Sequence, residues 1–144
     1  LYESLSVYGV RFHRHNSEIQ QQLNKYTKRE FDFNFTPHLI PMFRGILSTI
    51  YVDLNKNVKQ RDVINKLNEY YKNNSFIKIL SANKLLSTNE VINTNNCVIS
   101  ICKTKYKDKI IILSAIDNLI KGGAGQAIQN LNIRFDFPIE TGLR

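Results

Sequence analysis

The chain has 144 residues, of which 42% are hydrophobic and 22% are charged. These proportions predict one globular core and exclude a disordered tail, a collagenous fibre and a disulfide-stapled miniprotein. Twenty basic residues against twelve acidic ones give a formal net charge of +8, which leaves an anionic partner open as an alternative to a simply solvated surface.

The first thirty residues predict a strand followed by a surface helix. Residues 5–12 alternate in side-chain character as a half-buried strand does, and they end in a polar cluster around Arg14. Asn16 fits the N-cap of a helix that ends near Arg29, and Glu18 lies in its first turn, where a carboxylate meets the positive end of the helix dipole.

The rest of the chain predicts strands and helices without strict alternation. In chain order they are strands at 31–35 and 45–54, a helix at 59–71, strands at 76–80, 97–103 and 110–115, and a helix opened by the glycine-rich segment 121–125. The strands at 97–103 and 110–115 form a hairpin, and residues 135–144 form a tail. We predict an α+β domain with a mostly antiparallel or mixed sheet and helices on one face.

Neither membrane insertion nor export is indicated. The longest apolar run, Ile110 to Leu113, is far shorter than the roughly 20 residues that a bilayer crossing needs, and no signal peptide opens the chain. Cys97 and Cys102 are five residues apart in a predicted strand, so they face opposite sides and cannot form a disulfide with each other. We expect a cytoplasmic protein with free thiols.

The three histidines all lie within the first 38 residues. His13 and His15 flank Arg14 at the predicted strand end, where imidazoles can pass protons near neutral pH and the helix amides can bind an anion. A polar turn with surface histidines is the simpler alternative. Two histidines on one strand face also suit a metal pair, but the pattern supplies no third ligand, and we expect no metal.

Two further segments combine unusual residues. Residues 36–45 hold two prolines with Arg44 and Gly45, which favours either a stiff connection or a loop that sets Arg44 against an anion or a partner subunit. Residues 121–126 are rich in glycine but lack the spacing of a phosphate-binding loop, so tight packing of a helix start against another backbone or a ligand is favoured.

Three segments together resemble one enzyme family. They are His-Arg-His-Asn-Ser-Glu-Ile at 13–19, Phe-Thr-Pro-His-Leu-Ile-Pro-Met-Phe-Arg-Gly-Ile at 35–46, and Asp-Asn-Leu-Ile-Lys-Gly-Gly-Ala-Gly-Gln-Ala-Ile-Gln-Asn at 117–130. In this order they resemble the carboxyl-terminal half of the N-acetyl-gamma-glutamyl-phosphate reductases, with Ser17 where that family usually has proline. The resemblance spans essentially the whole chain and implies a C-terminal domain like that of glyceraldehyde-3-phosphate dehydrogenase.

The resemblance also implies a reaction and its residues. In that family, which serves arginine biosynthesis, a cysteine thiolate attacks an acyl phosphate, NADPH reduces the thioester to a semialdehyde, and a histidine serves as acid and base. His13 matches this histidine, and Tyr8 and Glu18 would orient its ring. Arg14 and Arg44 are assigned to the anionic groups of the substrate on their charge more than on the motif, and His15 is grouped with them as substrate-binding. The contacts with NADP are assigned to Asn118, Gly122, Gly123 and Gly125.

The sequence lacks two other motifs of that family, the Gly-Cys-Tyr-Pro-Thr segment that holds the nucleophile and the Gly-x-Gly-x-x-Gly of the dinucleotide fold, and it begins at Leu1. We therefore expect a carboxyl-terminal part that is inactive alone. Residues 1–116 would bind substrate and dimerise, and 117–144 would pack on the absent NADP-binding half.

The expected partners are an acyl-phosphate substrate, the N-terminal half and further copies of the protein in a dimer or tetramer, with no membrane and no nucleic acid. Two alternatives stay open. One is the related lysine-biosynthesis reductase, which acts on an aminoadipyl phosphate. The other is a basic module that binds nucleic acid with strong salt dependence.

Overall fold

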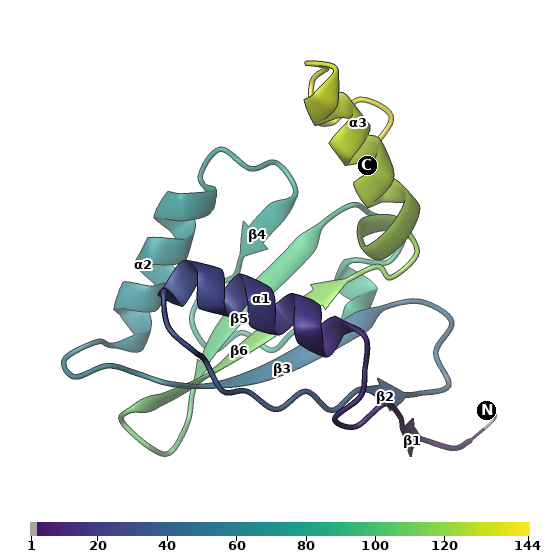
Figure 1. The fold of residues 1–144 in the computed structure, drawn as a ribbon. Helices are drawn as coiled ribbons and strands as arrows, with labels where there is room; N and C mark the ends of the chain where they lie inside the picture. Colours follow the sequence, from purple (N-terminus) through teal and green to yellow (C-terminus); the bar gives the residue numbers. More distant parts are fainter. Residues whose placement is uncertain (1–2) are drawn as a thin grey trace. The chain divides into compact units, whose positions relative to one another are not determined.

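The computed structural model describes residues 3–144 and divides the chain into two compact units, one ending at Phe43 and one running from Arg44 to Arg144. Figure 1 traces the chain through both. Among the described residues no helix is long and apolar enough to cross a bilayer. The predicted division after residue 116 concerns packing on another domain, and it stays a prediction.

The first unit contains a short antiparallel ribbon of β1 (Ser6–Val7) and β2 (His38–Leu39). The predicted strand at 5–12 is therefore wrong beyond Val7. Gly9 and Arg11 have positive φ values of 58° and 68°, which turn the chain out of the extended conformation. The turn is closed by the Phe12 amide, which donates to the Gly9 carbonyl oxygen at 3.1 Å.

The helix of this unit, α1 (His15–Thr27), follows the turn directly. Its N-cap is Arg14 rather than the predicted Asn16, and it ends two residues before the predicted Arg29. Ser17 Oγ donates to the Arg14 carbonyl oxygen at 3.1 Å, which ties the first turn of the helix together. Glu18 lies in the first turn, as predicted.

Residues 31–35 are not the predicted strand, although Phe31, Phe33 and Phe35 are half-buried and alternate with exposed residues, as expected. Side chains of α1 satisfy the backbone that a neighbouring strand would otherwise satisfy. Gln20 Nε2 donates to the Phe31 carbonyl oxygen at 2.6 Å, and the Phe31 amide donates to Asn24 Oδ1 at 3.0 Å. The backbone of Phe31 is thus satisfied by side chains of the helix rather than by a strand ladder.

The second unit is built on a four-stranded mixed sheet. The strands in spatial order are β3 (Ile46–Asp53), β6 (Lys109–Ile116), β5 (Cys97–Lys103) and β4 (Ile77–Ile79). Neighbouring strands are antiparallel except β4 and β5, which are parallel. All four predicted strands of this region and the β5–β6 hairpin are confirmed, because each alternates or runs apolar over its whole length.

The hydrophobic core of the sheet is formed by Val91, Val98 and Ala115 with Leu80 and Leu86. Val98 and Ala115 are register partners on β5 and β6, so the segment between β4 and β5, which includes the 3-10 helix η1 (Thr88–Glu90), supplies the other side of this core. Helix α2 (Gln60–Tyr71), predicted at 59–71, contacts β4 and β5.

The glycine-rich segment opens the last helix, as predicted. The π-helical turn η2 (Ile120–Ala124) leads into α3 (Gly125–Arg134), with a kink at Gly123. The tail folds back along α3 to the loop before β5. Asn132 Nδ2 of α3 donates to two carbonyl oxygens of the tail, and the Asn95 amide of the loop donates to the Arg144 carbonyl oxygen at 2.6 Å. Ile128, Leu131 and Ile133 of α3 are exposed.

Candidate functional site

His13 lies in the first unit, half-buried between the turn that follows β1 and the start of α1. Three rings meet its imidazole edge-on. The ring centroid of Tyr8 is 5.4 Å away, that of Phe35 is 5.3 Å away and that of His15 is 4.8 Å away. The structure therefore brings together three of the residues predicted from the sequence, and Phe35 joins them.

The backbone fixes which nitrogen of His13 carries its hydrogen. The His15 amide donates to His13 Nδ1 at 3.2 Å, so the neutral ring has its hydrogen on Nε2. In this arrangement Nε2 presents a hydrogen-bond donor. For Nε2 to give up its proton, or to take one, the ring hydrogen must lie on Nδ1. The His15 amide must then release its hydrogen bond to Nδ1.

The other predicted residues of this region are more exposed. Arg14, His15 and Glu18 all present their side chains to solvent. Within residues 3–144 no hydrogen bond or ion pair joins Glu18 to His13, so the predicted orienting contact of Glu18 is not formed here, whereas Tyr8 does pack on the ring. Within the same range no three side chains of the histidine, cysteine, aspartate and glutamate types form a metal-binding group.

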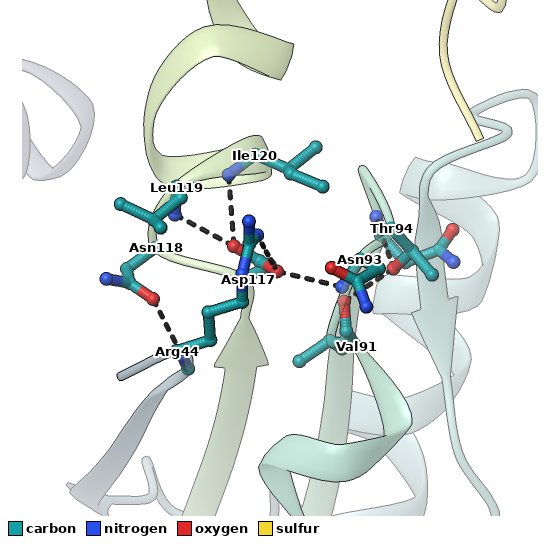
Figure 2. Close-up of polar contacts among 10 residues, drawn as sticks. Arg44, Val91, Asn93, Thr94, Asp117, Asn118, Leu119 and Ile120 are labelled. Carbon is teal, nitrogen blue, oxygen red and sulfur yellow. Dashed lines mark hydrogen bonds and ion pairs between the residues drawn. The ribbon is translucent and has the colours of Figure 1, made fainter. Parts of the chain in front are cut away.

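A second cluster, in the other unit, surrounds Asp117 at the end of β6. Figure 2 shows its carboxylate held from both sides. Oδ1 accepts hydrogen bonds from the amides of Leu119 at 2.8 Å and Ile120 at 3.0 Å. Oδ2 accepts from Arg44 Nη1 at 3.0 Å and from the Asn93 amide at 2.8 Å. Four donors on one fully buried carboxylate fix the start of η2, the loop before β5 and the entry to β3.

The charge on Asp117 is stabilised by these donors. Burial alone would raise the pKa of a carboxyl group, but the amides of Asn93, Leu119 and Ile120 and the guanidinium of Arg44 hold the pKa of Asp117 below its usual value. Asp117 is therefore a buried, ionised and fully paired group at neutral pH.

Arg44, predicted to bind a substrate anion, forms an ion pair with Asp117 in this structure. The neighbouring Gly45 amide donates to Asn118 Oδ1 at 2.6 Å, which holds the predicted cofactor residue Asn118 against the start of β3. Gly45 has a φ of 105°, and a Cβ there would lie 2.7 Å from Thr88 Cβ, so only glycine fits.

The glycines predicted to contact the cofactor differ in their surroundings. Gly122 and Gly123 are exposed, and a Cβ on either would lie no closer than 3.4 Å to another atom. Gly125 is buried, and a Cβ there would lie 2.5 Å from Asn95 Oδ1. Gly122 and Gly123 thus have room for a ligand, while Gly125 matches the tight-packing alternative.

Asp117 and Asn93 were not singled out as site residues by the sequence. Asp117 carries a signal, because an aspartate just before a helical turn commonly accepts hydrogen bonds from the first free amides of that turn. Asn93 carries none, since it contributes only its backbone amide.

The comparisons with known proteins agree with the predicted resemblance. A family model described as "Semialdehyde dehydrogenase, dimerisation domain" matches residues 1–118. An N-acetyl-gamma-glutamyl-phosphate reductase of Vesicomyosocius okutanii is 48% identical over 141 residues, which are 98% of this chain and 40% of that protein. One of Campylobacter jejuni subsp. doylei is 42% identical over 142 residues, 99% of this chain and 42% of that protein. The chain thus spans about two fifths of the length of these relatives.

Solved structures with low sequence identity share the fold. Aspartate semialdehyde dehydrogenase II from Vibrio cholerae superposes with a TM-score of 0.63 at 16% identity, over 84% of this chain and 37% of that one. Aspartate semialdehyde dehydrogenase from Francisella tularensis gives 0.60 at 20% identity, over 81% of this chain and 34% of that one. The predicted fold class is confirmed.

Proposed function

The chain belongs to the family of semialdehyde dehydrogenase dimerisation domains, and we propose that it is the carboxyl-terminal part of an N-acetyl-gamma-glutamyl-phosphate reductase. The complete enzyme would reduce N-acetyl-glutamyl phosphate to the semialdehyde with release of phosphate, a cytoplasmic step of arginine biosynthesis. The observation that carries the proposal is the 48% identity to a protein of that name over 98% of the chain.

His13 is the proton-transfer residue in this proposal. Its Nε2 would donate a hydrogen bond to the oxygen that gains charge when hydride reaches the thioester. That anion would then collapse to the semialdehyde and return the cysteine as its thiolate. NADPH, when bound to the complete enzyme, would supply the hydride and leave as NADP. Tyr8 and Phe35 hold the ring edge-on, which limits its rotation, and the His15 amide sets its resting tautomer. The exposed Arg14 beside it supplies positive charge for an anionic group of the substrate.

The cofactor would approach the second unit at Gly122 and Gly123, where the backbone is exposed and next to Asn118. We expect Gly123→Val to raise the KM for NADPH about tenfold or more, because a branched side chain fills the space that the nicotinamide end needs, at a small cost in thermal stability. Steady-state kinetics and a melting curve of the complete enzyme measure both. A large fall in melting temperature with an unchanged KM would assign Gly123 to packing alone.

We also propose that the complete protein is a homodimer through one face of β3. Leu47 and Tyr51, four residues apart on the strand, point to the same face and are 47% and 76% exposed. The segment between β4 and β5 packs on Ala115, the register partner of Leu47, and its Leu85 is 81% exposed. An apolar sheet face of this kind marks an interaction site, and the dimerisation-domain family indicates a second copy as the occupant.

Tyr51→Asp tests the dimer. A charge placed in an apolar interface has to be desolvated, so we expect the variant to sediment as a monomer at concentrations where the wild type is dimeric. Tyr70→Asp on α2 is the matched control, because Tyr70 is similarly exposed, at 72%, and lies outside the proposed face. Dissociation by Tyr70→Asp alone, or by neither variant, would contradict this choice of face.

The substrate is tested on the complete protein by NADPH oxidation with each of two acyl phosphates. We expect turnover of N-acetyl-glutamyl phosphate, with release of one phosphate per NADPH consumed. Preference for a carrier-bound aminoadipyl phosphate would select the lysine-pathway alternative. If neither acyl phosphate supports NADPH oxidation, the proposed function is rejected.

A further inference from the structure

We propose that Gly9 is a positioning residue for His13. The imidazole packs against the Gly9 backbone, at the place that a side chain on residue 9 would occupy. The inference rests on the proposed role of His13. Gly9 was predicted to lie within a strand and was given no role by its sequence pattern.

The contact is direct. A Cβ on Gly9 would lie 3.2 Å from both Cβ and Cδ2 of His13 and 3.4 Å from its Cα. Cδ2 is bonded to Nε2, the nitrogen that carries the ring hydrogen in this structure. Anything that displaces Cδ2 therefore displaces the atom that exchanges the proton.

The ring has little freedom to absorb the displacement elsewhere. Tyr8, Phe35 and His15 lie against it, and the His15 amide is bonded to Nδ1. The backbone is held as well, because the Asn16 amide donates to the His13 carbonyl oxygen at 2.9 Å. A side chain at position 9 would push the imidazole by a few tenths of an ångström against these contacts.

Gly9 also has a φ of 58°, which costs other residues conformational energy wherever it occurs. The chain offers a matched control for this cost. Gly142 has a φ of 72°, and a Cβ there would meet no atom within 4 Å. Gly142→Ala thus carries the backbone strain without a displaced neighbour, and Gly9→Ala carries both.

The test measures kcat, KM and the pH profile of kcat in the complete enzyme. We expect Gly9→Ala to lower kcat about tenfold with little change in KM and to move the limb of the pH profile that His13→Asn abolishes, since proton transfer is sensitive to sub-ångström geometry. Gly142→Ala should keep kcat within about twofold and leave that limb in place. Gly9→Asn adds the same Cβ with a residue that tolerates positive φ, so it should reproduce the loss even if Gly9→Ala folds poorly.

The outcomes separate the inference from its premise. If His13→Asn keeps full activity, the proposed role of His13 is wrong. If His13→Asn is impaired while both Gly9 variants match Gly142→Ala in kcat and pH profile, the role of His13 stands and the positioning role of Gly9 is overturned.

Discussion

Replacing His13 with asparagine in the complete enzyme should lower kcat by about a hundredfold to ten-thousandfold, the usual contribution of a positioned proton-transfer group. Folding should change little. His13 is half-buried rather than part of the core, and the asparagine oxygen can accept the hydrogen bond that the His15 amide now donates to Nδ1. Kinetics of the purified variant, with a melting curve beside them, measure the two effects.

His15→Asn is the internal control. Its exposed ring touches His13 at a centroid distance of 4.8 Å, but the hydrogen bond to Nδ1 comes from its backbone, which the substitution leaves in place. We expect a much smaller loss of kcat and a pH profile that keeps the limb lost in His13→Asn. Equal losses in both variants would mean that the motif holds the turn together and that another group carries the proton.

Replacing Asp117 with asparagine should have the largest effect on stability, about 3 to 5 kcal/mol, because it removes a buried charge that four donors share. Asparagine has one oxygen where aspartate has two. If its NH2 group takes the place of Oδ2, it faces two other donors, the Arg44 guanidinium and the Asn93 amide. A urea titration of the wild type and the variant measures the difference.

The pH dependence of the same variant gives an independent check. The pKa of Asp117 is lower in the folded protein than in the unfolded chain, so its contribution is fully present above the unfolded pKa and is lost as the pH falls through the folded pKa. Asp117→Asn should therefore flatten the loss of stability in acid. Asp53→Asn is the control, because Asp53 is largely exposed in its ion pair with Lys109. This variant should change the stability and its pH dependence little. Equal urea midpoints for wild type and Asp117→Asn would contradict the account of this cluster.

The sequence predicted the second unit better than the first. Strands such as β5 and the hairpin with β6 carry a local apolar pattern that the sheet satisfies directly. The predicted strand at 5–12 failed because Gly9 and Arg11 take positive φ values, which alternation does not reveal. Residues 31–35 show the right alternation, but side chains of α1, rather than a neighbouring strand, bind the backbone of Phe31.

The two clusters of the candidate site also differ in how far the sequence predicts them. His13, His15 and Tyr8 are close in sequence, so a motif sufficed to group them. Arg44 and Asp117 are 73 residues apart, and nothing local to Arg44 indicates that a buried carboxylate pairs with it. The charge of Arg44, more than its motif, predicts a substrate contact. The bond between Gly45 and Asn118 spans the same separation.

The acyl-transfer step tests the central claim most directly. When the complete protein is mixed with N-acetyl-glutamyl phosphate in the absence of NADPH, formation of the thioester should release a rapid burst of about one phosphate per active site. His13→Asn should slow that burst by about a hundredfold or more, because the thiol then lacks the imidazole, which takes its proton at Nε2 when the ring hydrogen lies on Nδ1. A burst of unchanged rate in His13→Asn, or no burst in the wild type, would contradict the assignment of this chain as the proton-transfer half of an acyl-phosphate reductase.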